Sequence, residues 1–440
     1  MKLVRQICII AFVFACLQPG WLKSQTRWTN HPENPVIGGQ FDPGALFIQR
    51  PSVVFDGDAY HMWYASVRVF LIANMQFNLN CMGYATSPDG VSWQSVKPVV
   101  MEPSLDMNAF DQLQAGQGWV IADNDTFKMW YWGFNPAAGE TGLNAIGYAW
   151  SLDGSKWNRV KGPGALGSVY DPGMAGLPDS LGLATPCVVK DGDTYHMWHS
   201  QVVAAPFIFR IGYARSSDGI HWTKVNGSGQ YGSVIDWGPL GSFDHLSASW
   251  PAVIKTDEGF MMWYYGYDGT VSRTGCNVSS DGIQWNRAPG VDASGACFDT
   301  ALGTSFENAL GTCVIRMPVQ YKMWYSPENS NLVNMAFSNN PTGAGNPDNP
   351  ARPNTFTLEQ NFPNPFNPST TIEYTVQNTC RVSLAVFNCS GQTVMESVNA
   401  VQQPGQYSVP LYMHGIPSGI YFYKIRMGDF QAVRKMVKIE

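Results

Sequence analysis

Positive charge is scarce in this chain of 440 residues. It has 27 lysines and arginines against 33 aspartates and glutamates, a net charge of −6, and only 14% of its residues are charged. An acidic protein is a poor match to a polyanion, so we expect no nucleic-acid partner. The composition also includes 13% aromatic residues, which is typical of strands that are buried on both faces.

Cysteine pairs with metal-binding spacing are absent. The sequence has no Cys-x-x-Cys motif, which argues against a zinc or redox site, and we expect no metal ligands and no cofactor. Cys187 and Cys313 occupy the same position of a repeated segment, which predicts small buried side chains. A disulfide such as Cys276 to Cys297 stays open, because an exported protein can form one.

Long apolar runs are also missing, apart from residues 7–17. Lys2 and Arg5 precede this run, which is too short to span a bilayer, so residues 1–24 are predicted to be a secretory signal peptide. We expect cleavage after Ser24, and a lipoprotein cleavage site before Cys16 is the alternative. No other segment is a candidate, so the mature chain is expected to have no transmembrane span.

The dominant feature of the chain is a segment that is repeated five times. Each copy has a short apolar strand, a turn, an aromatic strand ending in Met-Trp, and then Gly-Tyr-Ala and Ser-x-Asp-Gly-x-x-Trp or close variants. The Met-Trp pairs are 67, 68, 65 and 61 residues apart and end at Trp63, Trp130, Trp198, Trp263 and Trp324. Such a period indicates one supersecondary unit copied around an array.

Each copy predicts about four strands, because its pieces are rich in Val, Tyr and Trp and are bounded by Gly, Asp or Pro. Four strands in roughly 65 residues is the size of one propeller blade. Residues 25–341 are therefore predicted to form an all-β, five-bladed β-propeller. The fifth copy lacks its outermost strand, whereas the segment at Trp28 matches it. We expect this segment to pair with the strand at Met335 and to close the ring.

The sequence changes character after residue 341. Residues 342–355 are rich in Pro, Gly and Asn and are predicted to be a linker. Residues 356–440 hold alternating strands that predict a small β-sandwich. The segments 361–368, 419–423 and 434–437 of this module closely resemble the C-terminal sorting domain (type A) of the type IX secretion system. The resemblance implies Sec export, contact with the type IX machinery through residues 356–440, and a secreted or surface-attached protein.

The repeat itself resembles the five-bladed propellers of glycoside hydrolase families 43, 32 and 130. The resemblance rests on the motifs Pro-x-Val, Asp-Gly-Asp-x-Tyr-x-Met-Trp-Tyr and Gly-Tyr-Ala-x-Ser within residues 27–341. These motifs support the fold more strongly than any particular enzymatic reaction. In family 43 a carboxylate before the first inner-strand Pro is the general base. The equivalent residues here are not acidic, and they are Arg50, Gln117, Thr185, Trp250 and Gly311. No specific arabinan or xylan activity is therefore implied.

A second set of carboxylates precedes the inner strands as aromatic-Asp pairs, at Asp42, Asp111, Asp171, Asp244 and Asp299. A residue present in every blade is most simply a turn-capping residue. Alternatively, two or three of these acids act as general acid and base at the tunnel mouth. The catalytic candidates are Asp42, Asp111, Asp244 and Glu307, which lies before the fifth inner strand. We expect Arg50 to keep an adjacent carboxylate, such as Asp42, ionised.

Departures from the repeat give the substrate-binding candidates. His199 stands where the other blades have tyrosine after Met-Trp, and His245 follows Asp244. A buried core histidine is the alternative for His199. Exposed aromatics such as Trp237 and Trp250 can stack on sugar rings, although most tryptophans are expected to pack in the core. The substrate-binding candidates are Arg50, Gln117, His199, His245 and Trp250.

Two functions fit these features. The first is a secreted glycoside hydrolase that acts on a polysaccharide or oligosaccharide through paired carboxylates at the propeller tunnel. A phosphorylase is a variant of it that needs a basic phosphate pocket, with Arg50, Arg210 and Arg316 as candidates. The second is a non-catalytic surface propeller that binds glycans or proteins. A structural ion in the tunnel stays open in both cases.

Overall fold

The computed structural model describes residues 28–339, except 73, 139–141, 175–181, 205–207, 289–293, 298–308, 318–319 and 328–329, and residues 357–439, except 377–378, 404 and 429. The predicted signal peptide and linker lie outside the described residues. Within them, the regular structure is β-strand apart from two short 3-10 turns, η2 (Ala165–Gly167) and η3 (Gln230–Gly232). The predicted all-β class is confirmed.

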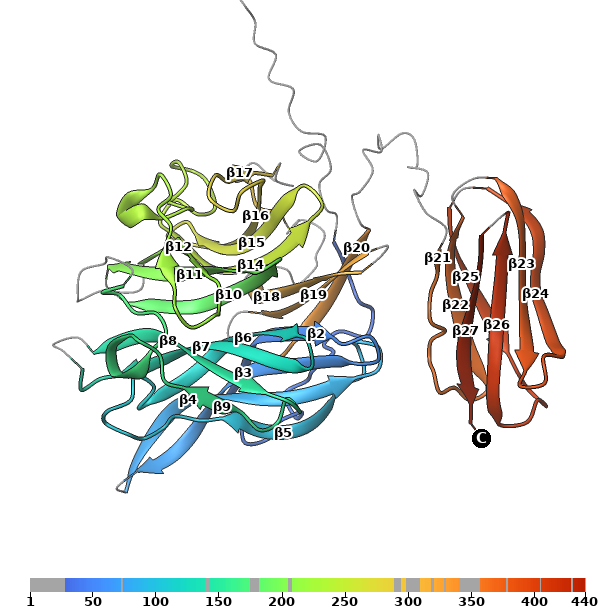
Figure 1. The fold of residues 1–440 in the computed structure, drawn as a ribbon, viewed down its shortest axis with the longest axis horizontal. Coiled ribbons are helices and arrows are strands. Elements are labelled where there is room, and N and C mark those ends of the chain that lie inside the picture. The colour runs from blue at the N-terminus through green and yellow to red at the C-terminus, as the bar shows by residue number, and fades with distance from the viewer. Residues whose placement is uncertain are drawn as a thin grey trace, which may run out of the picture.

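Five four-stranded antiparallel sheets follow one another in the first described part, coloured from blue to orange in Figure 1. Blade 1 consists of β2 (Phe47–Phe55), β3 (Tyr60–Ile72), β4 (Met75–Ser87) and β5 (Gln94–Met101). Blade 2 consists of β6 (Gln114–Asp123), β7 (Thr126–Asn135), β8 (Leu143–Ser151) and β9 (Asn158–Val160). Blade 3 consists of β10 (Leu183–Asp191), β11 (Thr194–Ala204), β12 (Ile208–Ser216) and β13 (Thr223–Lys224).

Blades 4 and 5 complete the array. Blade 4 consists of β14 (Ser247–Thr256), β15 (Gly259–Tyr267), β16 (Ser272–Ser279) and β17 (Asn286–Arg287). Blade 5 consists of β18 (Ala309–Arg316), β19 (Gln320–Pro327), β20 (Asn334–Asn339) and the N-terminal strand β1 (Thr29–Asn30). The inner strands β2, β6, β10, β14 and β18 contact one another in this order, and β18 contacts β2. The predicted five-bladed propeller is therefore a closed ring.

The hydrophobic core of the ring lies between blades. A separate buried cluster joins each neighbouring pair, including blades 5 and 1, where Trp324 and Met335 pack with Ile48 and Tyr64. The Met-Trp tryptophans are all fully buried. Large aromatic side chains fill the space between the faces of neighbouring sheets. Because these faces are buried, few charged residues can be placed on them.

In four of the five Met-Trp pairs, the indole also forms a hydrogen bond to the next blade, and Trp263 Nε1 has no such partner among the described residues. Trp63 Nε1 donates to the Gly154 carbonyl of blade 2 at 2.8 Å. The equivalent bonds run from Trp130 to Gly219, from Trp198 to Gly282 and from Trp324 to Gly90. Each acceptor glycine lies in a Ser-x-Asp-Gly turn, whose aspartate accepts backbone N–H groups. The turn motif is therefore an inter-blade joint as well as a turn.

The N-terminal segment closes the ring as the sequence predicted. Strand β1 pairs with β20, with Thr29 opposite Phe337, and the His31 amide donates to the Met335 carbonyl at 2.9 Å. Blade 5 thus obtains its outermost strand from the other end of the propeller. Strand β20 is therefore covered by β1 and is not the edge strand of its sheet.

The C-terminal module, drawn in red in Figure 1, is a two-sheet sandwich with its own core. One sheet has the order β21 (Thr357–Leu358), β22 (Ser369–Val376) and β25 (Gly405–Tyr412). The other has the order β24 (Thr393–Gln402), β23 (Cys380–Asn388), β26 (Gly419–Met427) and β27 (Phe430–Lys438). The predicted β-sandwich is confirmed.

The cysteines of the described residues are thiols, so Cys276 and Cys297 are not joined by a disulfide. Cys187 and Cys313 are buried, as predicted, and each Sγ accepts a backbone N–H from the next inner strand. No helix within the described ranges is long and apolar enough to cross a membrane.

Candidate functional site

The end of the ring where the inner strands begin is named here the upper face. Because strands alternate in direction along a blade, the loops before the inner strands and the hairpins between second and third strands lie at this end. The Asp-Gly turns that join first and second strands, and the Ser-x-Asp-Gly turns, lie at the opposite, lower face. The candidate site residues of the sequence belong to the upper face or to the axis below it.

A β-bulge interrupts each inner strand close to the upper face. One residue at the bulge of each blade has a positive φ, between 47° and 56°, and these residues are Arg50, Gln117, Thr185, Trp250 and Gly311. These five residues line one small cavity of about 30 Å³ on the axis. Non-glycine residues with positive φ are strained and cluster at functional sites. The structure therefore brings Arg50, Gln117 and Trp250 together.

Arg50 stacks on Trp250, with its guanidinium carbon 3.9 Å from the ring centroid. Part of the side chain is accessible, but Nε and Nη1 are buried and have no hydrogen-bond partner among the described residues. Burial lowers the pKa of Arg50 to about 9, so the group is still a cation at neutral pH. The expectation that Arg50 would hold Asp42 was wrong, because Asp42 is paired elsewhere.

Asp42 is 3% exposed and forms an ion pair with Arg68, which reaches it from the extended β3 strand. The Tyr64 hydroxyl, in the position after Met-Trp, also donates to Asp42 at 3.2 Å. Burial and the neighbouring Asp42 carboxylate raise the pKa of Tyr64. A carboxylate in such a buried network is held in one orientation by two donors.

Asp111 and Asp244 have the same surroundings in blades 2 and 4. Asp111 is bonded by Tyr131 at 3.0 Å and by Arg159 at 3.0 Å, and Asp244 is bonded by Tyr264 at 2.7 Å and by Arg287. Both carboxylates are at most 2% exposed. No distance places Asp42, Asp111 and Asp244 in one cluster, since each belongs to its own blade. Their arrangement as aspartate, tyrosine and arginine is a repeated structural unit.

Asp171 does not belong to this series. Its Oδ2 accepts the Ala165 amide at 2.7 Å, and the structurally equivalent residue is Asp236, whose Oδ2 accepts the Gln230 amide at 2.9 Å. Both aspartates follow a Gly-x-Gly-x-x-Gly-Ser-Val motif that forms η2 or η3. The interpretation of five equivalent aromatic-Asp pairs was therefore wrong for Asp171. Asp299 and Glu307 lie outside the described residues.

The residue of blade 3 that corresponds to Asp111 and Asp244 can be found from its distance in sequence to the positive-φ residue of the bulge. Asp111 and Asp244 stand six residues before Gln117 and Trp250, and the residue six before Thr185 is Asp179. Asp179 lies outside the described residues. In this blade the tyrosine partner is replaced by His199.

His199 is fully buried and contacts Tyr170 edge-on, with ring centroids 5.3 Å apart. Burial lowers its pKa to about 4, so the ring is neutral at pH 7. Neither ring nitrogen has a hydrogen-bond partner in the parts of the chain that the structure describes. The residue packs inside blade 3 and does not line the axial cavity.

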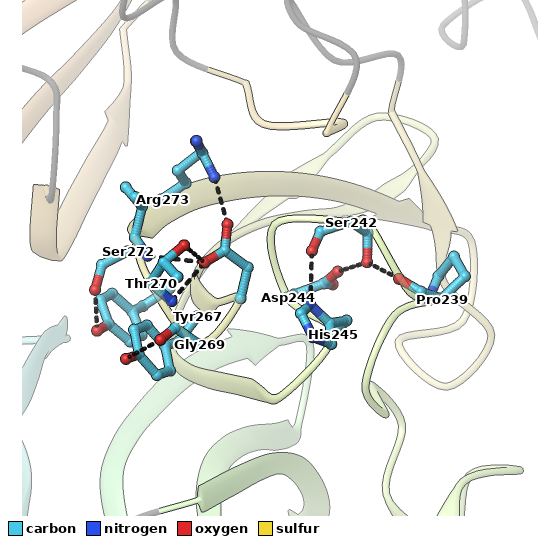
Figure 2. A network of polar contacts seen from close by, with 12 residues as sticks. Pro239, Ser242, Asp244, His245, Tyr267, Gly269, Thr270, Ser272 and Arg273 are labelled. Atoms are coloured by element: carbon cyan, nitrogen blue, oxygen red, sulfur yellow. Dashed lines mark hydrogen bonds and ion pairs between the residues drawn. The ribbon is translucent and has the colours of Figure 1, made fainter.

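His245 lies on the upper face of blade 4 beside Asp244 (Figure 2). The Ser242 hydroxyl is within hydrogen-bond distance of Asp244 Oδ1 at 2.8 Å and of the Pro239 carbonyl at 2.7 Å. His245 Nδ1 is 3.4 Å from the Ser242 carbonyl. Figure 2 also shows Arg273 on the neighbouring hairpin, where it pairs with Asp268 at 2.9 Å.

An aromatic platform lies next to β12 on the upper face. The Arg210 guanidinium lies 4.0 Å from the Trp237 ring centroid and 5.8 Å from that of Tyr231. Arg210 is 3% exposed and is fixed by Asp236 at 2.5 Å, whereas Trp237 and Tyr231 are 36% and 43% exposed. The Trp237 indole donates to the Phe209 carbonyl at 3.0 Å. Sequence reasoning named Trp237 and Arg210 separately and missed their contact, which the repeated Gly-x-Gly-x-x-Gly-Ser-Val-x-Asp motif could have indicated.

A metal site is not apparent in the described part of the chain. No group of three or more His, Cys, Asp or Glu side chains there is close enough to hold an ion.

The C-terminal module matches a known family. Residues 360–440 match the secretion system C-terminal sorting domain. The module is a type IX sorting domain, and it marks the chain for secretion or attachment to the cell surface.

The propeller is similar to proteins of known structure. A glycosyl hydrolase from Bacteroides ovatus superposes with a TM-score of 0.51 at 17% identity, covering 76% of this chain and 97% of that chain. A β-1,2-mannobiose phosphorylase from Listeria innocua, solved with β-1,2-mannobiose, gives a TM-score of 0.53 at 12% identity, covering 71% and 97%. A structure from the GH130 family of mannoside phosphorylases and hydrolases gives 0.51 at 15% identity, covering 76% and 97%. These likenesses establish the fold.

Two curated relatives are more similar in sequence. They are the uncharacterized proteins MT1551 and Rv1502 of two Mycobacterium tuberculosis strains, each 29% identical over 201 residues and covering 43% of this chain. The alignment spans 61% of the length of these relatives.

Proposed function

We propose that the protein is a secreted propeller that binds a glycan on its upper face, with glycoside hydrolysis as a second candidate function. The observation that carries the proposal is the pair of exposed rings, Trp237 and Tyr231, held against the buried guanidinium of Arg210. The C–H face of a sugar ring packs on such aromatic surfaces, and its hydroxyl groups bond to polar side chains around them.

The platform is rigid before any ligand arrives. Trp237 is fixed by its indole hydrogen bond and by Arg210, and Arg210 is fixed by Asp236 and by Gln230 at 2.8 Å. A preorganised ring costs little conformational entropy on binding. Sugar affinity then depends on the contact itself and not on ordering of the side chain.

Export supports a ligand outside the cell. The sorting domain directs the chain to the type IX machinery, and residues 1–24 are proposed to direct the preceding Sec step. A propeller with the same fold has been solved with β-1,2-mannobiose, so β-mannosides are the first glycans to test.

The test of glycan binding compares two tryptophans of equal exposure. Trp237→Ala is expected to weaken binding of a responding polysaccharide by at least about tenfold, because a stacked ring contributes more than 1.4 kcal/mol. Trp150→Ala is the matched control, because Trp150 is 37% exposed at the end of β8 toward the lower face. Affinity electrophoresis or calorimetry measures both. Equal losses for the two variants, or none for Trp237→Ala, would exclude the platform as the site.

Hydrolysis is favoured by one observation, the presence of Asp42, Asp111 and Asp244 around the same face. Glycosidases need two carboxylates about 5 to 10 Å apart, one of which donates a proton. Reducing-end release from a bound polysaccharide tests this candidate. Release by the wild type, and its loss per folded molecule in Asp244→Asn, supports an enzyme; binding without release supports a non-catalytic propeller.

A further inference from the structure

The sorting-domain sandwich has a four-stranded sheet in the order β24-β23-β26-β27, and the strand register sets which side chains share a face (Figure 1). Residues opposite each other in an antiparallel pair have their side chains on the same face. Tyr421, Tyr423 and Ile425 of β26 are buried in the sandwich core. The alternate residues of this strand therefore point outward, and they are Ile420, Phe422, Lys424 and Arg426.

The outward face of this sheet carries most of the positive charge of the module. Residues 356–440 contain six lysines and arginines. Lys435 of β27 is opposite Phe422, so it lies on the outward face. Arg381 precedes the buried Val382 of β23, so it also points outward. Four of the six cations share this face, and they are Arg381, Lys424, Arg426 and Lys435.

Acidic partners for these cations are scarce. Among the described residues, Glu396 is the one carboxylate on this face, and its Oε1 accepts the Asn399 side-chain amide at 2.7 Å. Arg381 donates to the neutral Asn399 Oδ1 at 2.8 Å. No ion pair is formed within the described part of the sandwich. The positive charge of this face is therefore left to solvent or to a partner.

The other sheet, β21-β22-β25, has an outward face of different character. Glu373 of β22 is exposed there opposite Ser408. Pro410 and Tyr412 of β25 are exposed on the same face, since the intervening Leu411 is buried. The three strands of this sheet contain no lysine or arginine. The charges of the sandwich are thus segregated between its two sheets, which packing of the core does not require.

Apolar side chains are exposed between the cations. Val433 is opposite Lys424 and is 54% exposed, and Phe422, opposite Lys435, is 36% exposed. Exposed apolar side chains that lie next to one another are typical of an interaction surface. A partner that covers Phe422 and Val433 also removes Lys424 and Lys435 from water. A cation that loses its water needs an anionic acceptor at a fixed position.

This arrangement fits an acidic protein surface better than a lipid surface. At a membrane, apolar side chains enter the acyl region while cations stay at the level of the headgroups. Neighbouring outward residues of one sheet, such as Phe422 and Lys435, project from it side by side. A folded protein can place carboxylates and apolar side chains next to each other to match them.

We propose that this cationic face, defined by Arg381, Phe422, Lys424, Arg426 and Lys435, docks on an acidic protein surface of the type IX machinery. Residues 360–440 match the secretion system sorting domain, so the machinery is the partner that this module meets. The contact involves one of its two sheets and leaves the other free. Glycan binding by the propeller is not needed for this docking.

Export of the full chain from a bacterium with type IX secretion tests the role of the charges. Lys424→Gln/Lys435→Gln is expected to lower the amount outside the cell at least about tenfold and to accumulate in the periplasm, because two charge-assisted contacts are lost. Pro410→Glu/Tyr412→Glu changes the net charge by the same amount on the other sheet. This matched control is expected to be exported normally, as is Lys424→Arg/Lys435→Arg, which keeps both cations.

A direct measurement covers the case in which Lys424→Gln/Lys435→Gln does not fold, as judged by circular dichroism of the chain recovered from the periplasm. A photocrosslinking analogue of phenylalanine in place of Phe422 is expected to form an adduct with an outer-membrane subunit of the machinery, identified by mass spectrometry. The same analogue in place of Tyr412 is expected to form none.

Three outcomes overturn the proposal: normal export of Lys424→Gln/Lys435→Gln, an equal loss of export in the Pro410→Glu/Tyr412→Glu control, or no machinery adduct from position 422. Vesicles of phosphatidylglycerol distinguish a lipid partner. Vesicle binding by the wild-type chain that is lost in Lys424→Gln/Lys435→Gln would assign the face to anionic lipid and overturn the acidic protein partner.

Discussion

Trp28 packs edge-on against Trp263, with ring centroids 5.8 Å apart and an interplanar angle of 75°. The same geometry joins the turn tryptophans Trp93, Trp157, Trp222 and Trp285 to the Met-Trp tryptophans Trp324, Trp63, Trp130 and Trp198. Trp28 is therefore the turn tryptophan of blade 5, supplied from the other end of the propeller. Blade 5 has no Ser-x-Asp-Gly turn of its own.

Trp28→Ala is expected to lower the free energy of unfolding by about 3 kcal/mol, because it removes a large aromatic contact at the closure. Urea unfolding followed by circular dichroism measures this loss. Trp150→Ala, on the exposed side of β8, is the control and is expected to cost less than about 1 kcal/mol. Similar costs for both variants would mean that the closing contact is not important for stability.

Asp42→Asn is expected to destabilise the propeller by about 3 kcal/mol, because it leaves the largely buried Arg68 without its carboxylate. The double variant Asp42→Asn/Arg68→Met is expected to recover part of the loss, since the two residues interact directly. Chemical denaturation of the single and double variants gives the coupling energy. An unchanged Tm in Asp42→Asn, with loss of an enzymatic activity, would instead show that Asp42 is catalytic.

A pH-dependent contribution is expected from Asp123 at the lower face. Burial alone raises the pKa of Asp123, but hydrogen bonds from Lys128, Lys190 and Tyr195 outweigh burial and hold it well below the usual range. The ionised form is thus favoured by folding. Its stabilisation is present above the unfolded-state pKa of about 4 and is lost as the pH falls below that value.

Asp123→Asn is accordingly expected to cost about 2 kcal/mol at pH 7 and much less near pH 2. Asp125→Asn, in the same turn but exposed, is expected to change neither stability nor its pH dependence. Thermal unfolding between pH 2 and pH 7 distinguishes them. A cost for Asp123→Asn that is constant over this range contradicts the assignment.

His199 gives a second dependence at higher pH. Burial lowers its pKa to about 4, whereas an unfolded histidine titrates near about 6.5. The unfolded chain gains a proton first as the pH falls, so stability decreases from about pH 6.5 to about pH 4 and then levels off. His199→Phe is expected to reduce this slope. Part of it remains, because burial also lowers the pKa of His196 to about 4.

Deleting residues 356–440 is expected to leave a folded propeller, because the sandwich core and the propeller cores share no residue. The Tm of the truncated protein is expected to match the propeller transition of the full chain. Cell fractionation is expected to find it in the periplasm. Normal amounts outside the cell would contradict the role of the sorting domain.

The repeat made the fold predictable because strands, turns and core tryptophans recur with the same spacing. Trp28 could be assigned to blade 5 from that spacing before any contact was known. Arg159 and Arg287 could also have been predicted as the partners of Asp111 and Asp244, since both stand two residues after a turn tryptophan. Arg68 could not be predicted as a partner of Asp42, because it lies in the long β3–β4 hairpin of blade 1 and not at a position of the repeat.

The site was less predictable because it depends on contacts between non-repeating loops. Asp171 and Asp42 both follow an aromatic residue, but they lie in loops that are not equivalent. The position of the bulge is what shows which loop residues of different blades correspond. The contact of Arg50 with Trp250 joins blades 1 and 4 across the axis, which no local pattern encodes. The spacing of the repeat predicts which residues are in contact within a blade, but it does not predict contacts across the axis of the ring.

The pairing of β1 with β20 imposes an order of events on folding. Thr29 and Phe337 are partners although more than 300 residues separate them, so β1 is synthesised long before its partner exists. Four blades can form successively, whereas the fifth waits for both ends of the ring. The ring can therefore close only after the whole domain has been synthesised.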